Sequence, residues 1–458
     1  MSVTDSLSCE AIEPQDERYE AARALWNGSV DHRPAAIARP RTDAEVAEAL
    51  LRARDQGADI AVRGGGHSMQ GHSMSHGGVT IDLSAINRVE VDTQTRRARV
   101  GGGALLGDVA RATGPYGLAI PYGHVSHTGV AGLTLGGGIG WITRRYGLAI
   151  DRLRAARVVT ADGDVVRTSD EENPDLFWGL RGGGGNFGIV TEFEFELCEH
   201  GPEVLAGMLL HPLERAGEVL RFSRDFMDEA PHDLTVYETF MTVPPEPPFP
   251  EELQGKPALA IGIVYAGDPD EGERVLRPLR EFGPPSLDML GRMPVIGAQE
   301  MLDPTAPHGM RNYSKSHWLA ELPDAAIQRM VELHSGVPSP MSLIITARMG
   351  GAIQRVAPES TAFVHRNAYR LLWVVGSWWE GDDAEQIEWT RGVFDALTPH
   401  STGGVYVNSL QDEPEQRIRD AYSNPVWARL VEVKDRWDPD NVFRLNYNVP
   451  PSARVRAA

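Results

Sequence analysis

Three clusters of glycine constrain the fold of this chain more than any other feature. Glycine-rich runs occupy residues 64–66, 129–140 and 182–188, and glycine makes up 48 of the 458 residues. Because glycine has no Cβ, it allows the backbone to come close to a ligand or to another part of the chain. One cluster alone is compatible with a tight turn. Three clusters so near one another predict that the backbone surrounds a single large ligand.

The first cluster follows a predicted strand. A capping-box pattern at Thr42 and Glu45 begins a predicted helix, and residues 59–63 are predicted to form a strand that runs into the glycines at 64–66. Residues 68–77 are predicted to be a loop. A Rossmann dinucleotide fingerprint would instead open a helix directly after the strand, so the sequence disfavours that fold.

The pattern changes after residue 200. Strands are predicted over 204–210, 234–243, 258–264 and 369–378, and helices over 214–227, 271–280 and 324–334. The proline-rich segment 243–250 is predicted to be a surface loop, because proline cannot join a central ladder. We therefore expect a second, α+β domain over about 201–400, between a first domain over 1–200 and a closing segment over 401–458.

Composition excludes several classes of function. The net charge of −20 disfavours binding to nucleic acid or to anionic lipid surfaces. The two cysteines, Cys9 and Cys198, are too few for a disulfide framework or a multi-thiolate metal site. No apolar run is long enough to span a membrane, and the first residues lack the pattern of a secretory signal. We expect a cytoplasmic protein that has no membrane partner.

His67, at the end of the first cluster, is the first candidate for chemistry. Backbone N–H groups of a glycine loop can bind a pyrophosphate, and Arg63 could supply a bidentate partner for it. The imidazole would then project beside that ligand. Two alternatives stay open: an ordinary polar loop residue, and a metal site. The metal site would be built from the histidines of this region, which are His67, His72, His76, His124 and His127.

Several long motifs resemble one known family. The segments at 62–68, 79–84, 136–151, 176–190 and 438–444 are similar, in order, to those of berberine bridge enzyme-like oxidases. These oxidases belong to the vanillyl-alcohol oxidase/p-cresol methylhydroxylase superfamily. The resemblance implies an α+β fold with a two-part FAD-binding domain of the p-cresol methylhydroxylase type. It also implies a substrate domain in which helices back an antiparallel sheet.

The resemblance implies that FAD is bound covalently. His67 matches the histidine that bonds through a ring nitrogen to the 8α carbon of FAD. Many relatives carry a second link, from a cysteine just before the middle glycine cluster, and that position is Val125 in this chain. Valine cannot bond the flavin. We therefore predict a single link through His67, and no metal.

The same resemblance assigns further flavin contacts. They are expected from the three glycine clusters and from a closing segment that returns to the first domain. The predicted contacts besides His67 are Arg63, Gly64, Gly65, Gly66, Ser68, Gly71, Val125, Ser126, Gly129, Gly132, Gly136, Gly138, Ile139, Gly140, Gly188, Ile189, Val190, Asn446 and Asn448. Tyr122, His124 and His127 are further candidates near the flavin ring. Trp373, Trp378 and Trp379 are either substrate-pocket aromatics or core.

The implied activity is oxidation of a small organic, sugar or secondary-metabolite substrate. A CH–OH or CH–NH carbon gives hydride to the flavin while a base takes the heteroatom proton, and dioxygen reoxidises the flavin to give hydrogen peroxide. Tyr406 is the predicted base, because 406–408 resembles the tyrosine-x-asparagine segment of the family. A tyrosine can serve as a base only if positive charge or hydrogen bonds lower its pKa.

Three rival functions stay open on the sequence. A dehydrogenase of the same fold would pass electrons to an acceptor other than oxygen. A non-enzymatic binding protein would keep the flavin only as structure, and a metal enzyme would contain no flavin. The identity of the substrate and the oligomeric state are not predicted.

Overall fold

The first small sheet presents the first glycine cluster. The computed structural model describes residues 7–455, and its N-terminal sheet has the order β1-β2-β4-β3, in which the last three strands are parallel. The strands are β1 (Glu10–Ile12), β2 (Ala36–Arg39), β3 (Ile60–Arg63) and β4 (Val79–Asp82). Helix α2 (Asp43–Asp55) crosses from β2 to β3. The Thr42 side chain accepts a hydrogen bond from the Glu45 N–H, as predicted, but the Glu45 carboxylate accepts from the Arg41 N–H, so the predicted capping box forms only in part. The glycines at 64–66 begin where β3 ends.

A second sheet carries the third glycine cluster. It is antiparallel and has the order β5-β6-β10-β8-β9. The strands are β5 (Val89–Asp92), β6 (Arg97–Gly101), β8 (Leu153–Val159), β9 (Val165–Ser169) and β10 (Ile189–Glu196). Phe193 and Phe195 of β10 are fully buried, as the alternating pattern predicts. Gly188 directly precedes this central strand.

The middle glycine cluster is not a loop throughout. Helix α4 (Val130–Leu135) lies inside it, because Val130 and Leu135 are apolar and both are buried. Short elements surround this region. They are α1 (Tyr19–Arg23), α3 (Leu106–Thr113), α5 (Thr143–Tyr146), α6 (Ala149–Arg152), α7 (Pro174–Leu180) and the two-stranded pair β7 (Leu118–Ala119) and β11 (Cys198–Glu199).

The large sheet confirms the predicted antiparallel sheet backed by helices. Its order is β15-β12-β14-β13-β18-β19-β17, and β16 also pairs with β12. The strands are β12 (Glu203–Pro212), β13 (Leu234–Thr242), β14 (Pro257–Tyr265), β15 (Leu287–Asp288), β16 (Gly291–Pro294), β17 (Arg311–Leu319), β18 (Leu343–Arg348) and β19 (Arg370–Trp378). The sequence missed β17, because polar residues such as Ser314, Lys315 and Ser316 are buried in it.

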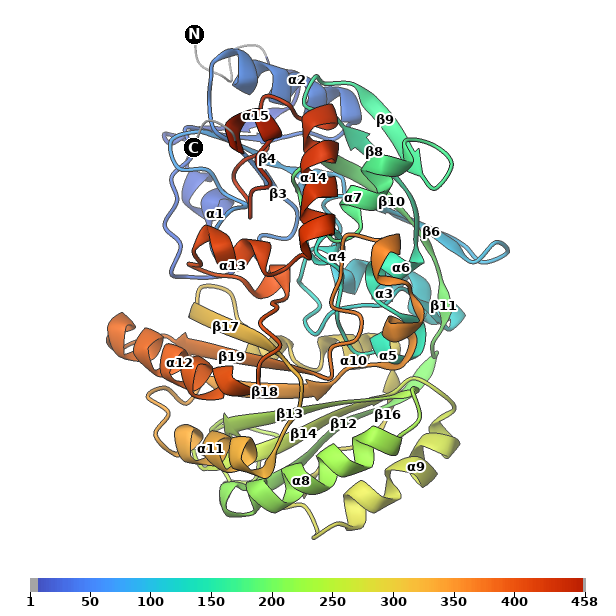
Figure 1. Ribbon diagram of the computed structural model, residues 1–458, viewed down its shortest axis with the longest axis vertical. Coiled ribbons are helices and arrows are strands. Elements are labelled where there is room, and N and C mark those ends of the chain that lie inside the picture. The colour runs from blue at the N-terminus through green and yellow to red at the C-terminus, as the bar shows by residue number, and fades with distance from the viewer. Residues whose placement is uncertain (1–6, 456–458) are drawn as a thin grey trace.

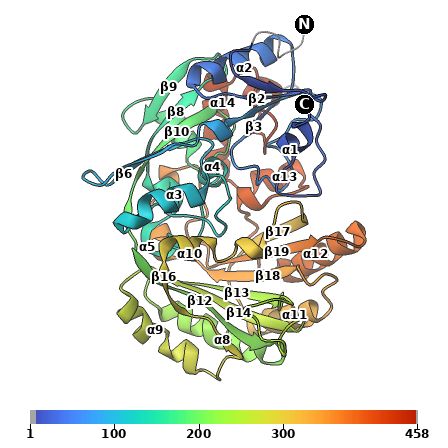
Figure 2. The same ribbon diagram turned by 180° about the vertical axis from the view of Figure 1, so that it is seen from behind.

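Three long helices cover one face of the large sheet. Figures 1 and 2 show α8, α9 and α11 on the side that points away from the small sheets. These helices and the two others of this part of the chain are α8 (Leu213–Glu229), α9 (Pro269–Glu281), α10 (Val295–Glu300), α11 (Asp324–Ser335) and α12 (Asp383–Leu397). Leu220 and Leu276 on the helices pack with Leu209 and Ile261 on the sheet. The opposite face of the sheet turns toward the glycine clusters.

The chain then returns to the small sheets. Helices α13 (Glu415–Arg419), α14 (Asn424–Trp437) and α15 (Ser452–Val455) follow, and α14 packs on α7 (Figure 1). The fully buried Lys434 donates to the Asp438 carboxylate over 2.6 Å and to the backbone carbonyls of Asn186 and Phe443. This buried pair fastens the closing segment beside the third glycine cluster. None of the helices in residues 7–455 is long and apolar enough to cross a membrane.

Candidate active site

One cavity lies between the uncovered face of the large sheet and the three glycine clusters. Its walls come from parts of the chain that are far apart in sequence. Among the predicted flavin contacts, it is lined by Gly64, Gly65, Gly66, His67, Ser68, Val125, Gly129, Gly132, Ile139, Gly188, Ile189, Val190 and Asn446, and the predicted base Tyr406 lines it as well. Tertiary structure therefore brings most of the predicted site residues together.

The remaining predicted contacts lie outside this lining. Arg63 donates to the carbonyl of Ala22, and the Ser126 N–H donates to the Asp303 carboxylate over 2.8 Å. Gly71 packs against Val30. The other residues outside the lining are Gly136, Gly138, Gly140 and Asn448.

The glycines serve two different purposes. An added Cβ on Gly140 would lie 1.6 Å from the carbonyl oxygen of Tyr122, and one on Gly136 would lie 2.0 Å from Oδ1 of Asn408. Packing against the protein itself therefore requires glycine there. By contrast, a Cβ on Gly132 or Gly185 would have nothing within 4 Å. Those two glycines leave open space on the cavity side, as a closely bound ligand requires.

Two of the clusters touch each other through backbone alone. A Cβ on Gly65 would lie 2.3 Å from the backbone nitrogen of Gly129, and a Cβ on Gly129 would lie equally close to the nitrogen of Gly65. Any side chain at either position would force the loops apart. This contact sets His67, two residues beyond Gly65, against the segment that precedes Gly129.

His67 is held in a cage of rings. Its imidazole stacks on Trp26 with 4.9 Å between ring centroids, and its Nε2 lies 2.7 Å from Nδ1 of His127. The indole of Trp26 is in turn anchored by a hydrogen bond from Nε1 to the carbonyl of Ala306. Burial, and then the neighbouring imidazoles of His127 and His308, lower the pKa of His67 well below its usual value. His67 is therefore neutral at physiological pH, and one ring nitrogen carries a lone pair.

The histidines of the alternative metal site only partly assemble. Ligand atoms of His67, His127 and His308 all lie within 4.8 Å of one another, so three imidazoles do converge. The other candidate histidines lie outside this group, although His72 and His124 line the same cavity. His72 packs on Tyr447, His76 is exposed, and His124 packs between Trp141 and Tyr237. The sequence missed Trp26 and His308, because neither belongs to a motif and only the fold brings them to His67.

Tyr406 has the donors that a phenolate needs. Its phenolic oxygen lies 3.1 Å from the N–H of Gly138 and 3.4 Å from that of Ile139, and Nδ2 of Asn408 donates to it over 3.0 Å. Burial raises the pKa of Tyr406, and these three hydrogen bonds act in the opposite direction. The net effect is a raised pKa of Tyr406, and no positively charged group counteracts it. Gly138 therefore acts on the site through its N–H and through Tyr406.

The large sheet supplies the wall opposite the glycine clusters. Trp373 lines the cavity, but Trp378 is buried with its Nε1 donating to Asp383, and Trp379 is 49% exposed on the surface. Of the three predicted tryptophans, only Trp373 belongs to the cavity. The other lining residues of the sheet are Tyr237, Thr239, Asn312, Leu343, Ile345, Leu371, Val375 and Ser377. No Asp, Glu, Lys or Arg lines the cavity within residues 7–455.

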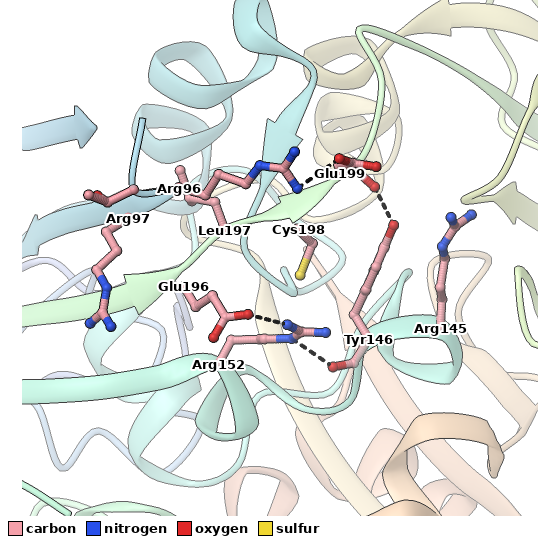
Figure 3. Close-up of a pocket in the computed structure, with 10 residues that line it drawn as sticks. Arg96, Arg97, Arg145, Tyr146, Arg152, Glu196, Leu197, Cys198 and Glu199 are labelled. Atoms are coloured by element: carbon pink, nitrogen blue, oxygen red, sulfur yellow. Dashed lines mark hydrogen bonds and ion pairs between the residues drawn. The ribbon is translucent and has the colours of Figure 1, made fainter. Parts of the chain in front are cut away.

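A second pocket, near β11, has different chemistry. Arginines crowd it, and Figure 3 shows Arg96 beside Glu199 and Arg152 beside Glu196. Arg145 pairs with Asp233, so these cations are already neutralised. Burial raises the pKa of the Cys198 thiol in this pocket to about 12, which leaves it unreactive. The pocket carries no candidate chemistry.

Comparisons with known proteins define the class first. Residues 34–169 match the model of the FAD binding domain, and residues 405–450 match the model described as berberine and berberine like. The chain is therefore an FAD-dependent oxidoreductase. The two matches cover the first two glycine clusters and the segment that contains Tyr406 and Asn446.

Similarity to whole proteins then defines the family. The chain is 31% identical to the (R)-6-hydroxynicotine oxidase of Paenarthrobacter nicotinovorans, and the alignment covers 97% of each chain. The crystal structure of 6-hydroxy-D-nicotine oxidase from Arthrobacter nicotinovorans matches with a TM-score of 0.87, at 29% identity over 98% of this chain and 99% of that one. The glucooligosaccharide oxidase of Acremonium strictum matches with a TM-score of 0.86, at 25% identity over 98% and 99%. The chain belongs to the berberine bridge enzyme-like FAD-linked oxidases of the p-cresol methylhydroxylase superfamily.

Proposed function

We propose that the protein is an FAD-dependent oxidase that takes hydride from a CH–OH or CH–NH carbon and passes the electrons to dioxygen. The observation that carries this proposal is the meeting of His67 and Tyr406 in one cavity walled by the three glycine clusters. Flavin, when bound, supplies the acceptor for the hydride. The polypeptide positions the flavin, supplies a proton acceptor and keeps water out of the cavity.

The cavity residues suit FAD. Gly132 and Gly185 leave room on the cavity side, where a side chain would otherwise protrude. Oδ1 of Asn446 is buried without a hydrogen-bond partner among the described residues, so a donor is needed there from outside the polypeptide. Neutral His67 suits a covalent bond to the 8α carbon. The glucooligosaccharide oxidase of Acremonium strictum is described as carrying a 6-S-cysteinyl, 8α-N1-histidyl FAD. Val125 lines the cavity at the cysteine position, so we propose the histidyl link alone.

Tyr406 is the proposed catalytic base. When the phenol has lost its proton, the N–H groups of Gly138 and Ile139 and the amide of Asn408 stabilise the phenolate. The substrate hydroxyl or amine would donate its proton to this oxygen while the adjacent carbon loses hydride. Fixed donors of this kind stabilise charge in a dry site without reorganising.

The lining favours an uncharged, largely apolar substrate. A buried ammonium or carboxylate requires a countercharge, and the described lining offers none. On the sheet wall, Asn312 already accepts a hydrogen bond from Ser377. Nε1 of Trp373 is a buried donor without a partner in the described chain, so it suits one acceptor atom of the substrate. A neutral aromatic or alicyclic alcohol, or an amine that binds in its uncharged form, fits these walls better than an oligosaccharide.

The proposal includes an organisation into parts. Residues 1–200 and 401–458 would hold FAD together, with the substrate domain over 201–400 between them, and the packing of α14 on α7 supports this division. A dehydrogenase with a non-oxygen acceptor is the rival within the class. We also propose a cytoplasmic location.

Two measurements test the function. The purified protein should be yellow, and the colour should stay with the polypeptide after acid denaturation. Anaerobic mixing with uncharged aromatic alcohols should bleach the flavin, whereas matched benzoate-bearing alcohols and cello-oligosaccharides should not. Mixing of the reduced enzyme with oxygen distinguishes the oxidase from the dehydrogenase, because slow reoxidation would reject the oxidase.

A further inference from the structure

The contact between His67 and His127 has a direction. Nε2 of His67 and Nδ1 of His127 are 2.7 Å apart, so one of these nitrogens carries the hydrogen and the other accepts it. The backbone of Ala306 also acts on the His127 ring and raises its pKa. In the tautomer of neutral His127 that carries its hydrogen on Nε2, Nδ1 of His127 accepts and Nε2 of His67 donates.

This tautomer leaves Nδ1 of His67 as a free nucleophile. No hydrogen bond to that nitrogen is present in the described chain, and the His67 ring faces the cavity. Stacking on Trp26 holds the plane of the ring. A neutral imidazole with its lone pair on Nδ1 is the form that can attack an electrophilic carbon.

Attack by His67 would place a positive charge on a buried ring. Once Nδ1 has bonded to carbon, the hydrogen on Nε2 makes the ring a cation. The burial that keeps His67 neutral disfavours that cation. The hydrogen must therefore leave, and the acceptor placed to take it is Nδ1 of His127.

We propose that His127 is the proton acceptor for self-catalysed attachment of FAD to His67. The inference rests on the proposed covalent link. In the step, a C–H bond of the flavin 8-methyl group breaks and its proton leaves to water, while a bond from Nδ1 of His67 to that carbon forms. Two electrons stay on the flavin ring, and dioxygen removes them as hydrogen peroxide. The Nε2 hydrogen of His67 passes to His127.

The surroundings of His127 support this role. Burial and then the His308 imidazole lower the pKa of His127, whereas the Asp303 carboxylate and the Ala306 backbone raise it. Asp303 is itself held by the Ser126 N–H. His308 packs on His127 with 4.7 Å between ring centroids and is exposed to solvent. A solvent-exposed imidazole therefore adjoins His127 and could pass its proton on to water.

The test measures attachment rather than turnover. His127→Ala removes the acceptor, and His127→Gln keeps a hydrogen-bonding side chain of similar length that cannot take the proton. His76→Gln is the matched control, because His76 lies in the loop that follows His67 but is exposed. Each protein is purified and incubated with FAD and oxygen, and the flavin that remains with the polypeptide after acid precipitation is followed over time.

The expected results separate a chemical role from a structural one. Attachment in both His127 variants should slow by about 100-fold or more while FAD still binds without a bond. Free imidazole should accelerate His127→Ala but not His127→Gln, and a rise in pH should accelerate both. The His76→Gln control should match the wild type.

Three outcomes would overturn the inference. Attachment at the wild-type rate in either His127 variant would show that no acceptor is needed there. Failure of imidazole to accelerate attachment in FAD-loaded His127→Ala would show that His127 has a structural role. Attachment that depends on added Zn²⁺ would also show a structural role, because it would favour a metal held by His67, His127 and His308. Acid-releasable FAD in the wild type would instead reject the covalent link itself.

Discussion

The amide of Asn408 donates a hydrogen bond to the phenolic oxygen of Tyr406 over 3.0 Å. The same amide also donates to the carbonyls of Gly132 and Leu133 on α4, so the tyrosine, its amide donor and the middle glycine cluster form one unit. The position of the proposed base is therefore coupled to the wall that would hold the flavin.

Replacement of Tyr406 by Phe should lower turnover by about 10²–10⁴-fold, because a general base contributes on that order. Flavin content should not change, since the ring still fills its place beside Phe363 and Trp318. Anaerobic reduction of the flavin in a stopped-flow instrument measures this step directly. Unchanged reduction in the Phe variant would reject the assignment.

The pH profile should distinguish the base from its donor. Because burial raises the pKa of Tyr406, kcat/KM should still be rising at pH 9 as the phenolate fraction grows. Asn408→Ala removes one hydrogen bond that lowers this pKa, so its rising limb should move to higher pH. A limb that moves to lower pH, or does not move, would contradict the role of Asn408.

Two glycines of the middle cluster should behave oppositely when changed to alanine. Gly132→Ala should keep or raise the melting temperature, because alanine stabilises a helix interior by about 0.5–1 kcal/mol, while FAD content falls as the new methyl group enters the cavity. Gly140→Ala should lower stability by about 1–3 kcal/mol, because its Cβ would overlap the Tyr122 carbonyl. Thermal melts and the flavin-to-protein absorbance ratio measure both effects.

Val125→Cys should create a second link to the flavin. Val125 lines the same cavity as His67, and the family resemblance assigns the second flavin link to this position. Mass spectrometry of proteolytic peptides should find one flavin joined to two peptides. In a double variant with His67→Ala, flavin retained on the cysteine peptide alone would confirm the position, and no flavin on that peptide would reject it.

Stability should fall as the solution is acidified below about pH 6.5. Burial lowers the pKa values of His200, His317 and His365 to about 4, whereas an unfolded histidine titrates near 6.5. Between these values the unfolded chain binds more protons, so the free energy of unfolding falls as the pH falls through this window. Urea denaturation at pH 7, 6 and 5 measures the slope. His200→Gln should flatten it, and an equal slope would contradict the contribution of His200.

Local patterns were enough to predict much of the fold. The alternation of Phe193 and Phe195 and the apolar run predicted at 369–378 follow a period that burial imposes on neighbouring residues. The cap at Thr42 follows from a local hydrogen bond to the Glu45 N–H. The strand at 311–319 escaped prediction because the fold buries its polar side chains with partners that come from elsewhere. Lys315, for example, pairs with Glu413.

The candidate site also contains some residues that the sequence could predict and others that it could not. The sequence alone determined that glycine loops, a histidine after the first of them and a tyrosine in a late motif belong to a flavoprotein, because motif residues are neighbours along the chain. Only the tertiary structure decided that Trp26, His127 and His308 surround His67, and that Gly140 is glycine for the sake of a carbonyl oxygen. Such contacts join segments up to hundreds of residues apart, and the packing of sheets and loops against one another fixes them rather than any local period.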